Sequence, residues 1–276
     1  MAAIVLALGA SLTWGFADFF GPLKGRAFGA LRVLFYVQLG GLAGIALIVA
    51  VRWKGPADAA ALLAIPAAVS GTLGLYAYYR GMAVGAMSVV APIAGISAVV
   101  PVVVGIASGD RPSTWQSAGI ACALVGVFLA SREQARTGSR LAAGVGLALL
   151  AALGFGGYFP PMHAAGDADF WWASLFFRLT SSTVILSAVA IRRPSLRVPP
   201  VQLPLLALIG VGDMLGNLLF AAASASGLVS VTSVLASLYP IVTVVLARIV
   251  LAERVARSQE AGIGLTLAGV GLISAG

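Results

Sequence analysis

The chain has 276 residues, of which 60% are hydrophobic and only 9% are charged, and its formal net charge is +8. Soluble domains carry about 25% charged residues, so the composition excludes a soluble globular protein and predicts an integral membrane protein. The positive charge does not indicate nucleic-acid binding, because the basic residues are scattered between apolar runs without forming a continuous basic face.

Ten apolar runs follow one another along the chain, each close to the roughly 20 residues that a membrane span needs. A backbone in lipid must satisfy its own hydrogen bonds, and no run shows the alternation of a barrel strand. We therefore expect an all-α integral membrane protein with ten transmembrane helices, at 3–20, 31–51, 59–79, 87–107, 113–131, 141–159, 170–191, 201–224, 229–250 and 258–275.

The first two predicted helices hold one aromatic and two charged residues of interest. Trp14 is a candidate for the wall of a solute cavity, with ordinary packing as the alternative. Asp18 and Arg32 lie near the ends of their predicted spans. We therefore expect both side chains to reach the solvated interface.

The third and fourth predicted helices carry further candidates. Tyr76 and Tyr79 each combine an apolar ring with one hydroxyl, which suits a small amphipathic solute. Packing, or anchoring at the membrane interface, is the alternative for both. Ser97 is a polar candidate inside the fourth span. Pro92 and Pro101 each free a carbonyl and bend that helix, which predicts either a hinge or a static kink.

The middle of the chain offers little that would support catalysis or metal binding. His163, Asp167 and Asp169 fall in a predicted loop, and their spacing matches no strong metal site, so we expect no metal. The single cysteine, Cys122, is expected to pack as a small apolar residue. Tyr158 is a further aromatic candidate. No phosphate-binding glycine motif is present, and we expect no enzymatic activity and no cofactor.

Helices 7 to 9 hold the residues that point most directly to transport. Arg178 and Asp213 are charged residues inside apolar spans, where a charge is costly and functional by default. Asn217 lies one turn after Asp213 on the same face. We expect a buried ion pair that either carries transport or fixes helix packing. Tyr239 is a candidate cavity residue, and Pro240 bends helix 9 as the other prolines bend helix 4.

The chain also repeats itself. Residues 116–129 and 259–272 are identical at eight of 14 positions, at a shift of 143 residues. We expect two five-helix repeats at 1–131 and 141–276, joined by a charged link at 132–140. Because five is odd, the second repeat enters the membrane from the opposite side, which makes an inverted repeat.

The motifs of the chain resemble those of the drug/metabolite transporter superfamily, specifically its ten-helix EamA-type transporters. The resemblance covers nearly the whole chain and is carried by Trp14-Gly15, residues 81–92, Gly109-Asp110-Arg111, Leu238-Tyr239-Pro240 and Ala252-Glu253-Arg254. Members of this family carry amino acids, sugars, nucleotide derivatives or other metabolites. The resemblance also implies cytoplasmic termini, whereas the excess of basic residues in the opposite set of loops favours external termini.

The sequence predicts a multi-pass protein of the cell membrane that moves a small metabolite or amino-acid-like solute by alternating access, with export favoured over uptake. The candidate binding residues are Tyr76, Tyr79, Ser97, Arg178, Asp213, Asn217 and Tyr239. A membrane receptor or scaffold without transport activity is the alternative from another class. The sequence leaves open whether a proton or a counter-solute drives the solute, and whether the chain forms a homodimer.

Overall fold

A computed structural model describes residues 1–84, 94, 96–131, 145–250 and 257–275. Within these ranges the structure is helical and contains no strand. The α-helices are α1 (Ala2–Phe28), α2 (Ala30–Arg52), α3 (Ala64–Val84), α5 (Val99–Ala107), α6 (Thr114–Ser131), α7 (Val145–Arg192), α8 (Leu203–Ser224), α9 (Val229–Ala236), α10 (Tyr239–Val250) and α11 (Arg257–Ala275). Short 3-10 helices are η1 (Ala59–Leu63), η2 (Ile96–Ala98) and η3 (Pro200–Gln202).

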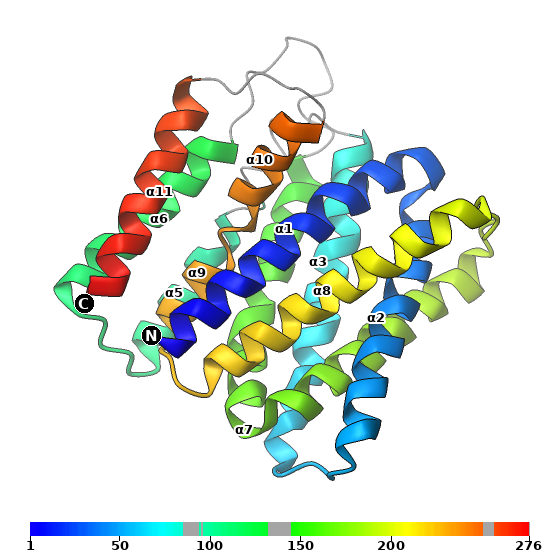
Figure 1. The fold of residues 1–276 in the computed structure, drawn as a ribbon, viewed down its shortest axis with the longest axis horizontal. Coiled ribbons are helices and arrows are strands. Elements are labelled where there is room, and N and C mark those ends of the chain that lie inside the picture. Colours follow the sequence, from blue (N-terminus) through cyan, green and yellow to red (C-terminus); the bar gives the residue numbers. More distant parts are fainter. Residues whose placement is uncertain (85–93, 95, 132–144, 251–256, 276) are drawn as a thin grey trace.

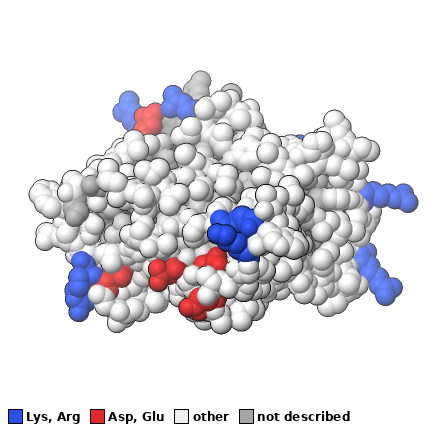
Figure 2. Space-filling model, turned by 60° about the horizontal axis from the view of Figure 1, so that its bottom comes forward, with Lys and Arg blue, Asp and Glu red and all other residues white. Residues whose placement is uncertain are grey.

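The helices form one bundle in which segments far apart in sequence lie side by side (Figure 1). Six helical segments of the described chain are long and apolar enough to cross a membrane. Helix α1 packs on α8, and α3 packs on α7, while α6 and α11 pair at one edge of the bundle. On the face shown in Figure 2, charged side chains gather in a few separate clusters, with broad uncharged surface between them. Such a surface suits a lipid environment.

Helix α7 covers 48 residues but is divided by a kink at Asp169, whose backbone is extended at φ −162° and ψ 97°. The Asp169 carboxylate accepts the backbone N–H groups of Trp171 and Trp172 at 3.0 and 3.2 Å, which caps the second section of the helix. Its other oxygen accepts the N–H of Ala57 at 3.0 Å, from the segment that follows α2. The loop predicted around His163 is therefore wrong, because helix continues up to the kink.

Two of the prolines that were expected to bend helices, Pro101 and Pro240, instead lie in the first turns of helices. Helix α9 ends at Ala236 and α10 begins at Tyr239, so Pro240 is the second residue of the new helix. A proline is tolerated there because the first N–H groups of a helix have no intrahelical partner. Pro101 likewise lies in the first turn of α5, directly after η2. Pro92 lies outside the described residues.

Candidate functional site

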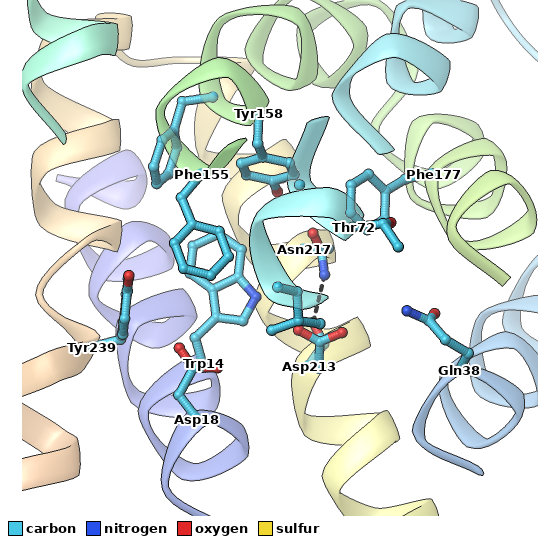
Figure 3. Close-up of a pocket in the computed structure, with 13 residues that line it drawn as sticks. Trp14, Asp18, Gln38, Thr72, Phe155, Tyr158, Phe177, Asp213, Asn217 and Tyr239 are labelled. Carbon is cyan, nitrogen blue, oxygen red and sulfur yellow. Dashed lines mark hydrogen bonds between the residues drawn. The ribbon is translucent and has the colours of Figure 1, made fainter. Parts of the chain in front are cut away.

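A cavity with about 550 Å³ of non-atom space, part of it open to the outside, lies between the helices of the bundle. It is bordered by six helices, α1, α2, α3, α7, α8 and α10 (Figure 3). The lining residues are Trp14, Asp18, Gln38, Gly71, Thr72, Leu75, Phe155, Tyr158, Phe159, Phe177, Asp213, Asn217 and Tyr239. They come from both the first and the second predicted repeat.

Aromatic rings make up much of the cavity wall. Trp14 and Tyr158 meet edge to face with ring centroids 5.8 Å apart, and Tyr158 meets Phe177 in the same way at 5.3 Å. Edge-to-face contacts of this kind hold each ring in one orientation. The indole of Trp14 lies directly over Gly216 of α8, where an added Cβ would come within 2.5 Å of the ring. The glycine therefore allows α1 and α8 to approach closely enough to close this side of the cavity.

An ion pair lies at the cavity floor. The guanidinium of Arg178 donates to the Asp213 carboxylate at 2.7 Å and to the side-chain oxygen of Gln38 at 2.8 Å. Gln38 also accepts from the Ser181 hydroxyl at 3.0 Å. Arg178 is 1% exposed, while the Asp213 side chain is 15% exposed and faces the cavity. The predicted pair is thus present, and its acidic member is the one that lines the cavity.

The arginine fits into the bundle because a glycine stands beside it. A Cβ added at Gly41 of α2 would lie 2.9 Å from Cζ of Arg178 and 2.7 Å from the carbonyl oxygen of Gly210. These distances leave no room for a side chain at Gly41. The small residue therefore makes space for the guanidinium and for the crossing of α2 with α8.

Asp18 lines the cavity and is 9% exposed, so the expected position at the solvated interface is wrong. The reason is that α1 does not end near residue 20 but continues through Pro22 to Phe28. Asp18 consequently lies well inside the helix, one turn after Trp14 on the same side. Arg32 does stay near the surface, where it donates to the carbonyl oxygen of Arg197 at 3.0 Å.

Three hydroxyl groups on the lining residues have no hydrogen-bond partner in the described part of the chain. They belong to Thr72, Tyr158 and Tyr239, and each oxygen is buried; the hydroxyl of Tyr239 lies near that of Ser97. A buried hydroxyl without a partner is costly, and native proteins rarely leave one unpaired. The side chains that carry these hydroxyls border the cavity.

The structure brings together some of the predicted binding residues and separates others. Asp213, Asn217 and Tyr239 line the cavity, and Asn217 donates to the Asp213 carbonyl oxygen at 2.7 Å. Arg178 lies behind Asp213 and does not itself line the cavity. The three others lie outside the lining; Tyr76 is half-buried, whereas Tyr79 and Ser97 are buried.

A family model for EamA-like transporters matches residues 1–132 and again residues 142–275. The chain belongs to the EamA-like transporter family. It is therefore a multi-pass membrane transporter, in agreement with the apolar helices of the bundle. No curated protein matches the sequence.

The fold of the transporter is similar to that of a solved structure described as "Crystal structure of protein". The two chains are 17% identical, and the likeness covers 99% of this chain and 98% of the other, with a TM-score of 0.78. At this identity the likeness shows a shared fold and nothing about the solute.

Several residues that line the cavity of the transporter were not predicted from the sequence. Gln38 and Thr72 are polar residues in the middle of apolar spans, so the cost of a polar group in lipid could have revealed them. Phe155, Phe159 and Phe177 carried no such signal, because an apolar side chain is compatible with both the lipid and the interior of the bundle. Only the observed contacts distinguish these rings from the other apolar side chains.

Proposed function

We propose that this transporter is a secondary carrier that binds a small solute in the central cavity and moves it by alternating access, with export favoured over uptake. The observation that carries the proposal is the lining of the cavity, which takes residues from both halves of the chain and includes buried hydroxyls without a partner among the described residues. Solute sites of secondary transporters lie at the interface between repeats, where each half can close one side in turn.

The proposed architecture is ten spans in two inverted five-helix repeats. Helix α7, about 72 Å long at 1.5 Å per residue, is too long for one crossing of a hydrocarbon core of about 30 Å, and its kink separates two spans. Helices α9 and α10 together form one broken span. The two ranges matched by the family model support the division of the chain into two halves.

Close contacts between glycines support a pseudo-twofold axis between these halves. At the shift of 143 residues, Gly119 corresponds to Gly262 and Gly126 to Gly269. An added Cβ on Gly119 would lie 2.6 Å from the carbonyl oxygen of Gly269, and one on Gly126 would lie 2.8 Å from that of Gly262. Gly119 therefore contacts the residue that corresponds to Gly126, and Gly126 contacts the residue that corresponds to Gly119. A twofold axis produces this reciprocal pattern of contacts.

Cysteine accessibility tests the cavity directly. Cys122 is first replaced by Ala, and single cysteines are then introduced at Thr72, at Asn217 and, as a buried control outside the cavity, at Ala123. The first two positions should react with a water-soluble thiol reagent, and a solute found by thermal-shift screening should slow the reaction. Ala123→Cys should stay unreactive, because its side chain is 0% exposed between α6 and α11.

Flux in proteoliposomes then separates a carrier from a receptor. Accumulation of the screened solute that depends on an imposed proton or counter-solute gradient supports secondary transport, and its direction distinguishes export from uptake. Labelling of Ala123→Cys with no reaction at Thr72→Cys or Asn217→Cys would overturn the proposed cavity.

A further inference from the structure

The charges around the cavity do not balance. Asp18 and Asp213 both line it, and Arg178 is the one cation that reaches it among the described residues, through its contact with Asp213. The second amino group of that arginine is held by Gln38. One carboxylate charge is therefore left without a protein cation to pair with it.

Asp18 is the carboxylate in question. In the described part of the chain its side chain has neither an ion-pair partner nor a hydrogen bond to another residue. The ionisable side chains near it on the neighbouring helices are Asp213 of α8, Tyr78 and Tyr79 of α3, and Tyr239 of α10. None of these is basic, and Arg26, farther along α1, lies near Tyr78 and donates to the carbonyl oxygen of Met82. An isolated carboxylate in such surroundings must take up a proton or meet a cation.

The side chains next to Asp18 are suited to an organic cation. Trp14 lies one turn earlier on α1, and the close-up shows its indole beside Asp18 at the cavity wall (Figure 3). Phe155 and Tyr239 extend the aromatic surface, with ring centroids 6.4 Å apart. Aromatic faces attract ammonium groups as well as apolar bodies, and the attraction grows when water is excluded.

We propose that the solute of this transporter is an organic monocation, an ammonium group joined to an aromatic or aliphatic body, with the ammonium bound by Asp18. The inference rests on the proposed function of the cavity and narrows its solute class. It disfavours carboxylates and therefore ordinary amino acids, because Arg178 is 1% exposed and its two amino groups are already bound to Asp213 and Gln38.

Three probes of nearly equal size test the charge preference: phenethylamine, 2-phenylethanol and 3-phenylpropionate. Binding to the purified protein is measured by calorimetry and by the fluorescence of the tryptophans. Phenethylamine should bind at least about tenfold more tightly than the alcohol, the size expected for one desolvated cation contact. The propionate should bind more weakly than either.

Substitutions at Asp18 test whether this side chain binds the ammonium group. Asp18→Asn should remove the advantage of the amine over the alcohol without weakening the alcohol, and Asp18→Glu should restore part of it. Asp167→Asn is the matched control, because Asp167 is an exposed carboxylate on α7 outside the cavity lining. It should bind all three probes as the unmodified protein does.

The outcomes separate the inference from the proposed function. The solute class is overturned if the amine binds no better than the alcohol, binds not at all, or keeps its advantage in Asp18→Asn. In those cases the carrier itself still stands if a neutral or anionic solute protects Thr72→Cys and Asn217→Cys from labelling. Failure of that protection with every solute would instead remove the cavity as a solute site.

Discussion

Helices α6 and α11 meet through glycines at the edge of the bundle, whereas α1, α7 and α8 meet around the cavity through rings, carboxylates and a guanidinium. The first region gains its stability from close backbone packing, since lipid offers no hydrophobic driving force between helices. The second contains costly polar groups that a purely structural interface would avoid. The contrast separates a region that packs backbone against backbone from the region in which we propose that the solute binds.

The largest effect is expected at the ion pair. Arg178→Leu leaves Asp213 without its cation, and removing one partner of a buried pair costs about 3–5 kcal/mol. The variant should show a strongly reduced melting temperature in detergent and a low yield of folded protein. Replacing both residues by Leu should recover much of that loss. Equal losses in the single and double variants would show that the pairing itself is unimportant for stability.

A somewhat smaller effect is expected at the glycine contact. Gly119→Leu places a side chain against the backbone of α11, and overpacking of this kind costs about 1–3 kcal/mol. Gly264→Leu is the control, because an added Cβ there meets no atom within 4 Å. Melting temperatures of the two variants should differ clearly. If both behave alike, α6 and α11 do not owe their pairing to small residues.

Asp213→Asn should leave the protein folded but lower solute flux about tenfold, the loss expected for one hydrogen bond to a charged group. The amide still accepts a bond from Arg178, yet the charge that faces the cavity is gone. Flux in proteoliposomes is compared with that of Asp167→Asn at equal protein content. Unchanged flux would reduce this pair to a packing feature.

The smallest effect is expected at Tyr239. Its hydroxyl lies near that of Ser97 without a well-formed hydrogen bond in the described chain, so Tyr239→Phe should change stability by less than about 1 kcal/mol. The same variant should bind the solute about fivefold more weakly if that hydroxyl donates to it. Calorimetry and thermal unfolding on one sample measure both quantities. A large loss of stability would mean that the hydroxyl has a structural role.

The contrast between these regions also explains what the sequence could predict. The Arg178–Asp213 pair was predictable, because an unpaired charge inside an apolar span is costly and pairing with an opposite charge on the adjacent span reduces that cost. Asp18 was misplaced because the glycine and proline of Gly21-Pro22 suggested a helix end, whereas packing against other helices carries α1 through that point. Composition identifies a span more reliably than it identifies where the helix ends.

The faces of the helices were harder to predict than their existence. On α3, Thr72 lines the cavity but Tyr76 and Tyr79 do not, and the ring of Tyr79 lies instead over Gly25 of α1. The rotation of α3 is set by its close approach to α7, where an added Cβ on Gly74 would meet the backbone of Gly154 at 3.0 Å. That contact depends on the partner helix, and no local pattern in α3 reveals it.

The two partners of Arg178 are synthesised at different times, one before the arginine and one after it. Gln38 precedes Arg178 by 140 residues and Asp213 follows it by 35. At about 5–20 residues per second, the ribosome delivers the arginine roughly 2–7 s before its carboxylate exists. An arginine at the centre of an inserting helix costs about 2.5–3.5 kcal/mol. During that interval Gln38, which is made earlier as part of α2, is the available acceptor. Its side-chain oxygen can accept a hydrogen bond from the arginine before Asp213 has been synthesised.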